Sequence, residues 1–170
     1  LVSMLLMLTS KEHSDALFLP ASADQLEQAK RTLEIEDLSQ AVIACAEYTA
    51  HELERLIPQN GITVEYANEL SLSLQQLKTN TEKMTICAAL EVEEPSTFSE
   101  ALGIAMEFDD YGRITYGEGE YARRALRGLR TTEELLEAID GYTDFDQLGR
   151  DKMDEDGVRQ TGYGLVRRLS

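Results

Sequence analysis

The first sixty residues alternate between short apolar runs and polar turns. Apolar side chains dominate residues 4–9 and 16–19, and a polar turn over residues 10–15 separates the two runs. Short apolar runs bounded by turn residues predict two strands. Residues 22–25, Ser-Ala-Asp-Gln, form a capping-box sequence that predicts the start of a helix. A third apolar run over residues 41–48 predicts a buried strand. We therefore expect mixed α/β structure in this section.

The clearest interruption of this pattern lies at residues 58–61, Pro-Gln-Asn-Gly. Before it, residues 49–52 form a second possible capping box, and apolar positions 53, 56 and 57 predict a short helix. Proline, asparagine and glycine together are a strong turn signal. The sequence therefore predicts a domain boundary here, with residues 1–61 forming an N-terminal α/β domain.

The middle of the chain shows helical periodicity. Apolar residues at positions 64, 67, 70, 74 and 77 lie on one face of a predicted helix. A turn over 79–81 precedes a second helix that begins near Met84, and Pro95 separates it from a third helix that begins near Phe98. Three short helices joined by tight turns predict a small bundle. We expect residues 62–110 to form a central helical domain.

The last section, residues 111–170, predicts a C-terminal α+β domain. Glycines at 112, 117 and 119 favour a loop or a short ribbon at its start. In order, the pattern then predicts a basic helix over 121–129, a helix capped at 131–134, a short acidic helix over 143–148 that Gly149 ends, and a closing strand over 163–169. The whole chain is therefore expected to be α+β, with three small domains.

Charge narrows the possible functions. The 170 residues include 32 acidic and 16 basic side chains, for a formal net charge of −16. General nucleic-acid binders need a basic surface, and anionic membranes attract basic segments, so direct binding to either is not expected. Residues 84–112 hold seven acidic side chains and no Lys or Arg. This window is either an ordinary solvated face or a surface built to be anionic.

A surface built to be anionic could space its carboxylates as DNA spaces its phosphates. Duplex DNA carries one charge per ~1.7 Å of its axis, and helical carboxylates three or four residues apart lie ~5–6 Å from one another. Several acidic helices can therefore imitate the spacing of phosphates. The candidate phosphate-mimic residues are Glu65, Glu69, Glu82, Glu91, Glu93, Glu94, Glu100, Glu107, Asp109, Asp110, Glu133, Glu134, Glu137, Asp140, Asp144 and Asp146.

Several segments match a known pattern in order. They are Tyr-Ala-Asn-Glu-Leu-Ser-Leu-Ser-Leu at 66–74, Ala-Ala-Leu-Glu at 88–91, Phe-Ser-Glu-Ala-Leu at 98–102, Glu-Phe-Asp-Asp-Tyr at 107–111 and Tyr-Thr-Asp-Phe-Asp-Gln-Leu-Gly-Arg-Asp at 142–151. In these segments the chain resembles the ArdA antirestriction proteins of plasmids and conjugative transposons.

The resemblance implies an elongated homodimer whose curved acidic surface imitates bent DNA. It implies binding to the DNA groove of type I restriction–modification enzymes, on their modification and specificity subunits, without catalysis or a cofactor. Tyr111, Ile114 and Tyr116 are candidate dimer contacts, because the related family pairs through its C-terminal region. The alternative for these three residues is packing within their own domain.

Four arginines interrupt the acidic surface at 123, 124, 127 and 130. One interpretation is a helix that binds nucleic acid, which the overall charge disfavours. The preferred interpretation is pairing with nearby acids, in the same chain or across a dimer. The acids in reach are Glu118, Glu120, Glu133, Glu134 and Glu137.

Other chemistry finds little support in the sequence. A calcium loop that uses Gly157 would place Lys152 and Tyr163 at ligand positions, so residues 154–157 are expected to be an acidic turn. The two histidines have no partner at metal spacing, and no catalytic motif is present. An enzyme and a metal site are therefore not expected.

Cys45 and Cys87 stand apart in apolar segments and predict free thiols in a cytoplasmic protein. The apolar start has no basic leader, and no apolar run is long enough to span a bilayer. The alternative function is an acidic regulatory protein of a mobile element that binds another basic DNA-binding protein.

Overall fold

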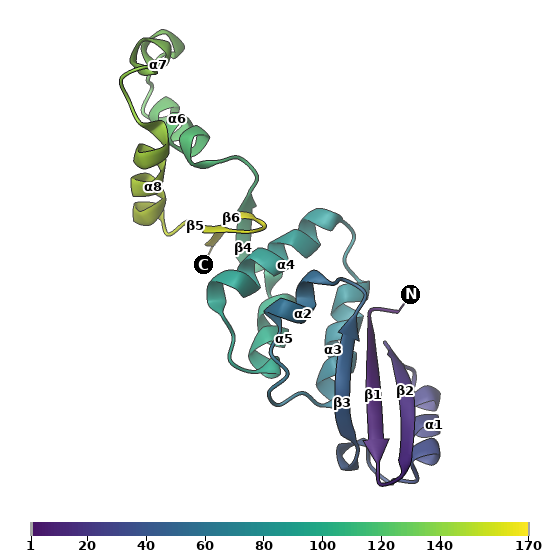
Figure 1. Ribbon diagram of the computed structural model, residues 1–170. Helices are drawn as coiled ribbons and strands as arrows, with labels where there is room; N and C mark the ends of the chain where they lie inside the picture. The colour runs from purple at the N-terminus through teal and green to yellow at the C-terminus, as the bar shows by residue number, and fades with distance from the viewer. Residues whose placement is uncertain (1, 170) are drawn as a thin grey trace. The chain divides into compact units, whose positions relative to one another are not determined.

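A three-stranded antiparallel sheet organises the first part of the chain in the computed structural model, which describes residues 2–169. Its strands are β1 (Met4–Ser10), β2 (His13–Leu19) and β3 (Val42–Tyr48), in the order β2-β1-β3 (Figure 1). The expected strands are confirmed, but the third was predicted to be buried and is instead an edge strand in which only Ala46 and Tyr48 are buried. β2 begins three residues before the predicted run, because a two-residue turn closes the hairpin and lets His13 pair with Ser10.

One face of this sheet is covered by helices. Met4, Leu6 and Leu8 of β1 alternate toward that face and are at most 1% exposed, as a strand with a side-chain period of two requires. Helices α1 and α3 pack against β2, α3 also packs against β1, and α2 packs against β3. The helical elements of this part are α1 (Ala23–Leu33), the 3-10 helix η1 (Leu38–Gln40), α2 (Glu52–Leu56), α3 (Val64–Gln75), α4 (Asn80–Glu93) and α5 (Phe98–Met106).

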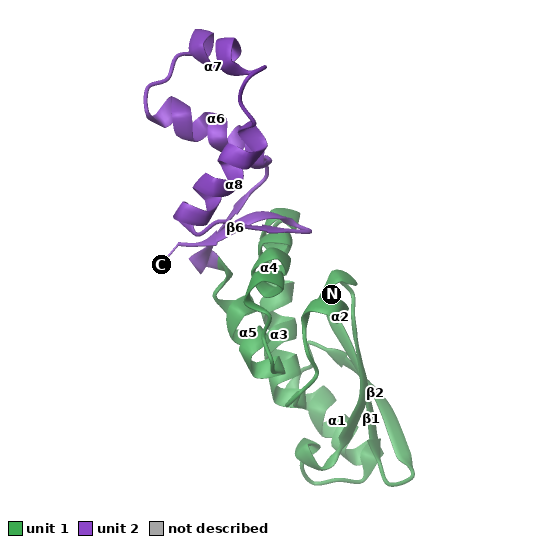
Figure 2. Ribbon diagram, turned by 60° about the vertical axis from the view of Figure 1, so that its left-hand side comes forward, with its two compact units in different colours: residues 1–108 green, residues 109–170 purple. Residues whose placement is uncertain are grey.

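Two compact units make up the chain, so the predicted elongated chain of three small domains is wrong. Unit 1 ends at Phe108 and unit 2 begins at Asp109 (Figure 2). Unit 1 contains both the sheet and the helices that were expected to form a separate central domain. The α+β character of the chain is retained.

Contacts across residues 58–61 explain why that turn separates no domains. The amide of Phe98 donates to the carbonyl of Asn60 at 2.8 Å. The side chain of Asn68 on α3 accepts from the amide of Ala21 at 2.8 Å, which connects α3 to the end of the hairpin. Helix α2, before the turn, packs against α4, after it. The turn therefore reverses the chain inside one unit.

Helix starts in unit 1 follow local capping chemistry. Ser22 forms the predicted capping box with Gln25, and the side chain of Thr63 caps α3. Thr79 forms a capping box with Glu82, so the residues predicted as a turn at 79–81 begin α4 instead. The predicted capping box at 49–52 is wrong: His51 precedes α2 and makes no side-chain capping bond.

Unit 2 combines a second small sheet with three helices. The strands are ordered β4-β6-β5 and are antiparallel. One apolar cluster consists of Tyr121, Met153, Val158 and Leu165. A second consists of Ala122, Leu136 and Phe145, one from each helix. The elements are the 3-10 helix η2 (Phe108–Asp110), which spans the division between the units, β4 (Tyr111–Ile114), α6 (Glu118–Gly128), α7 (Glu133–Ile139), α8 (Phe145–Asp156), β5 (Arg159–Thr161) and β6 (Gly164–Arg168).

Helix α8 corrects the prediction for residues 143–148. It continues through Gly149 to Asp156 and is capped by Gly157, whose φ of +72° suits the left-handed end of a helix. Gly149 is required by packing: a Cβ atom there would lie 1.9 Å from the carbonyl oxygen of Glu118 on α6. The expected acidic turn at 154–157 is the last turn of this helix and its cap. The short strand β5 was not predicted.

Candidate acidic interface

Most of the predicted mimic carboxylates lie at the surface. Glu82, Glu91 and Asp110 are half-buried, and the other thirteen are exposed. They come from α3, from α4 and α5 and the residue that follows each, from η2, and from the stretch between α6 and the first turn of α8. Exposure makes them accessible to a partner, but a carboxylate can already be engaged by this chain's own donors. The predicted set therefore divides according to those contacts.

Three of the carboxylates serve helix starts. Glu82 accepts from the amides of Lys78 and Thr79 ahead of α4, and Glu100 accepts from the amide of Ser96 at 2.8 Å. Asp144 caps α8 by accepting from the amide of Gln147 at 3.0 Å. These bonds satisfy amides that the first turn of a helix leaves open. The three side chains are therefore structural in unbound protein.

Three others pair with cations of the same chain. Glu91 lies 3.6 Å from Arg55. In unit 2, Glu133 pairs with Arg127 at 2.6 Å and Asp140 pairs with Arg123 at 3.0 Å. These pairs reduce the negative charge that a partner would meet at those positions.

Eight carboxylates are both exposed and unengaged by any other residue between positions 2 and 169. We call them the free carboxylate set. Two lie one turn apart on α3, at the spacing expected to resemble neighbouring phosphates. The set is Glu65, Glu69, Glu94, Glu107, Asp109, Glu134, Glu137 and Asp146.

The structure adds acidic side chains that the sequence reasoning missed. Exposed carboxylates without a partner among residues 2–169 also occur in the first sixty residues, on turns, strand β3 and the short helix α2. They include Glu12, Glu36, Glu47 and Glu54. The available signal was the charge count, ten acidic against four basic residues in positions 1–60. No motif distinguished these residues, because an isolated surface glutamate has no pattern of its own.

Arg124 and Arg127 of α6 pair inside unit 2 with two of the expected acids, whereas Arg123 pairs with Asp140 instead, and Arg130 forms no ion pair among residues 2–169. Arg127 bridges Glu120 at 3.0 Å and Glu133 at 2.6 Å. Both carboxylates raise the pKa of Arg127, with Glu133 contributing most, and Arg127 in turn lowers the pKa of Glu120. Arg124 contacts Glu120 at 3.2 Å, and its guanidinium carbon lies 4.0 Å from the centre of an aromatic ring, that of Tyr116.

Tyr116 is one of the three predicted dimer contacts. Tyr116 and Ile114 are half-buried and pack against the apolar cluster around Tyr121. Tyr111 is 8% exposed, in β4. These positions describe the single chain, and the use of the three residues in a dimer stays a prediction.

The arrangement of possible metal ligands and the buried thiol of Cys87 bear on reactive chemistry among the described residues. Within residues 2–169, no three His, Cys, Asp or Glu side chains come together as metal ligands. Cys87 is fully buried, and burial raises the pKa of its thiol to about 11, with Glu52 adding to the effect. Because the thiolate is the reactive form, this cysteine is not poised as a nucleophile at neutral pH.

Comparison with known proteins adds no relative: no family model matches the chain, and the search of curated proteins gives no match. The similarity to the ArdA family therefore rests on the segments quoted from the sequence. Among the described residues, no helix has the length and apolar character needed to cross a bilayer.

Proposed function

We propose that this chain is an acidic DNA mimic that occupies the DNA-binding groove of type I restriction–modification enzymes and blocks them. The observation that carries the proposal is the free carboxylate set, on a chain of net charge −16. A groove that holds phosphates with Lys and Arg can hold carboxylates by the same charge-assisted hydrogen bonds. The ordered resemblance to the ArdA segments selects the type I enzymes as the target.

The proposed partner is the modification and specificity core of such an enzyme, met in the cytoplasm by a homodimer of this chain. The mechanism is displacement: the protein fills the groove, and DNA is excluded because both cannot occupy it. No bond is made or broken. Electrostatic attraction accelerates the encounter and weakens with ionic strength.

A competition titration tests the proposal. A purified type I methyltransferase core is held on a fluorescent duplex that contains its target, and the protein is added at low salt. We expect stoichiometric release of the duplex, seen as a fall in anisotropy. A folded protein that leaves the duplex bound at saturating concentration would contradict the proposal. Capture of a different basic DNA-binding protein from a lysate without type I enzymes would then favour the regulatory alternative.

Two matched variants locate the surface. The first replaces Glu65, Glu69, Glu94 and Glu107 of the free carboxylate set by glutamine. The second replaces Glu12, Glu36, Glu47 and Glu54, which are also exposed and unengaged within residues 2–169. Both lie in unit 1 and remove four charges. We expect the first variant to lose about a hundredfold in affinity for the core, at roughly 0.7 kcal/mol per contact, and the second to lose much less.

A further inference from the structure

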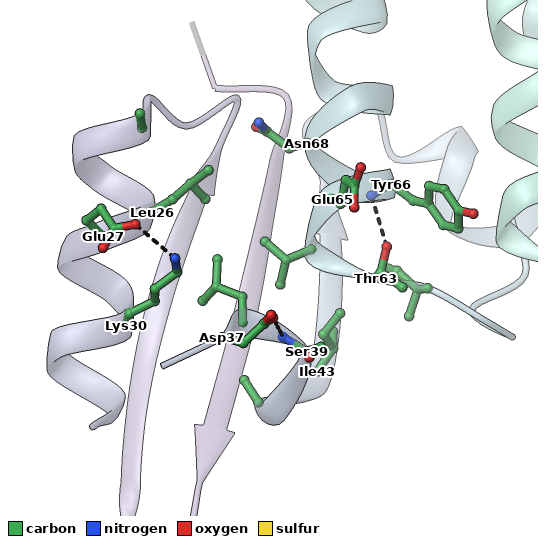
Figure 3. Close-up of a pocket in the computed structure, with 15 residues that line it drawn as sticks. Leu26, Glu27, Lys30, Asp37, Ser39, Ile43, Thr63, Glu65, Tyr66 and Asn68 are labelled. Carbon is green, nitrogen blue, oxygen red and sulfur yellow. Dashed lines mark hydrogen bonds and ion pairs between the residues drawn. The ribbon is translucent and has the colours of Figure 1, made fainter. Parts of the chain in front are cut away.

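A cleft lies between α1 and α3 in unit 1. It encloses about 800 Å³, within the range of sites that hold ligands. Its walls are α1 on one side and the first turns of α3 on the other, and η1 and β3 close its lower end (Figure 3). The cleft therefore interrupts the helical layer over the sheet.

Apolar and polar side chains share the lining of the cleft about equally, and the apolar ones come from facing walls. Leu26 of α1, Ile43 of β3 and Ile62 before α3 line it and are only half-buried. In Figure 3 the ring of Tyr66 points away from α1, so it does not fill the space. Partly exposed aliphatic side chains on facing walls favour an occupant with an apolar stripe.

The rim of the cleft is anionic. Lys30 is the one basic side chain among the described residues that line the cleft, and it pairs with Glu27 at 2.8 Å, which neutralises both charges locally. Among residues 2–169, neither Asp37 nor Glu65 forms an ion pair, although Lys30 attracts Asp37 from beyond ion-pair distance. The amide and hydroxyl of Ser39 hydrogen-bond to Asp37 and lower the pKa of its carboxyl group, which keeps it ionised. The occupant that complements this rim carries positive charge beside its apolar stripe.

We propose that this cleft binds a basic amphipathic helix of a partner protein. A helix with apolar residues at i, i+3, i+4 and i+7 would place that stripe against Leu26 and Ile43 and its Lys or Arg residues beside Asp37 and Glu65. It would complete the helical layer that α1 and α3 leave open. This site shares Glu65 with the free carboxylate set but also recognises apolar side chains, and it does not depend on the proposed antirestriction activity.

A labelled peptide tests the site on the full chain. The probe is a leucine–lysine peptide of about 18 residues, long enough to form a helix, with the leucines on one helical face. The control peptide has the same composition in scrambled order, and so the same charge. At ~0.15 M ionic strength, we expect the amphipathic peptide to bind at least about tenfold more tightly. Equal affinity for both peptides would overturn the proposal.

Matched variants separate the cleft from general attraction to an acidic protein. Leu26→Ala removes a cleft wall, whereas Leu72→Ala removes an exposed leucine of α3 outside it. Glu65→Gln removes a rim charge, whereas Glu69→Gln removes an equal charge one turn further along α3. We expect each cleft variant to lose about fivefold or more in affinity and each control to lose less than about twofold. Equal losses in the paired variants would contradict the site.

A measurement on the wild-type protein covers the case in which Leu26→Ala fails to fold. Amide chemical shifts recorded during the peptide titration should change at α1, Ile43 and the start of α3. Changes confined to unit 2, or spread evenly over all acidic segments, would overturn the proposal. No restriction enzyme is present in these assays, so a failure here leaves the displacement titration as an independent test of the proposed function.

Discussion

The two units use similar side chains in different ways. Residues 1–108 hold 18 acidic and 6 basic side chains, a net charge of −12, and the later residues hold 14 and 10, a net charge of −4. In unit 1 most carboxylates have no cation to pair with. In unit 2 ion pairs connect α6 to α8 and to the segment between them, as Arg150–Glu118 at 2.8 Å illustrates. In unit 1 most of the unpaired carboxylates are exposed to solvent, whereas in unit 2 ion pairs connect the helices.

The two units also differ in the size of their apolar cores, and unit 1 has the larger one. Unit 1 buries a sheet face and several helices around side chains such as Leu6, Leu70 and Phe98, which are fully buried. Unit 2 has two smaller apolar clusters and adds cation–π contacts, including Arg123 4.4 Å above the ring of Phe145. A larger apolar core can tolerate the self-repulsion of an acidic surface. Unit 1 is therefore the better platform for carboxylates presented to a partner.

The largest expected effect is the loss of apolar packing in unit 1. Leu70→Ala on α3 removes a fully buried side chain and should lower the free energy of unfolding by about 4 kcal/mol. Leu72→Ala, two residues away and 44% exposed, is the control and should cost less than about 1 kcal/mol. Urea unfolding followed by circular dichroism measures both. Equal effects would contradict the assignment of the α3 core face.

A glycine provides the corresponding test in unit 2. Gly149→Ala forces a Cβ atom against the carbonyl of Glu118, and the helices must separate, at a cost of about 2–3 kcal/mol. Gly128→Ala on α6 has open space around the new atom and should be neutral or slightly stabilising. Hydrogen exchange should show the loss in unit 2 amides. A stable Gly149→Ala protein would show that α6 and α8 do not cross this closely.

Two tyrosines sharpen the comparison further. The hydroxyl of Tyr121 in unit 2 donates to Asp156 at 2.6 Å, so Tyr121→Phe should cost about 1 kcal/mol at neutral pH. The hydroxyl of Tyr48 in unit 1 is buried and has no hydrogen-bond partner within residues 2–169. Tyr48→Phe should therefore be neutral or stabilising, because no hydrogen bond is lost. Thermal unfolding of both variants distinguishes the two signs, and a loss of stability in each would refute the contrast.

The Tyr121–Asp156 contact also predicts a pH dependence. Burial, and then the bond to Asp156, raise the pKa of Tyr121 from 10.0 to about 12, and this bond lowers the pKa of Asp156 below 3.8. The contribution of Tyr121 to the free energy of unfolding is full below pH 10 and is lost as the pH rises through about 12. The aspartate contribution is full above pH 3.8 and is lost at lower pH. The stability difference between wild type and Tyr121→Phe should therefore narrow in acid and in strong alkali, and a constant difference would argue against the bond.

Salt should produce the smallest effect, with opposite signs in the two units. Added salt screens repulsion among the unpaired carboxylates of unit 1 and raises its stability. It also weakens exposed ion pairs such as Arg127–Glu133 in unit 2. Hydrogen exchange at two sodium chloride concentrations measures both units in one sample. The same sign in both would mean that the ion pairs of unit 2 contribute little.

Local patterns predicted much of the fold. The strands of the first sheet and the starts at Ser22 and Phe98 follow from short-range periodicity and caps, which depend on neighbouring residues. The division into domains did not follow, because the Asn60–Phe98 bond that closes unit 1 joins residues 38 positions apart in the sequence. The full length of α8 was missed because Gly149 is a helix breaker by local rules and a packing requirement in three dimensions.

The candidate interface was predictable in composition and not in detail. Acidic residues at helical spacing are visible in the sequence, and thirteen of the sixteen predicted carboxylates are exposed. The Thr-x-x-Glu sequences at 79–82 and 97–100 carry a capping signal that the prediction did not use. Sequence could not show that Asp140 pairs with Arg123. The cleft between α1 and α3 left no sequence signal, because its walls come from segments separated by some thirty residues.

The most direct test of the account is the salt dependence of binding between this protein and a type I methyltransferase core. The wild type is compared with the variant that lacks Glu65, Glu69, Glu94 and Glu107. We predict that wild-type affinity falls steeply with salt, and that the variant binds more weakly with a clearly shallower slope, because fewer ion contacts form. Equal slopes and equal affinities would contradict the claim that the outward-facing carboxylates of unit 1 meet the partner.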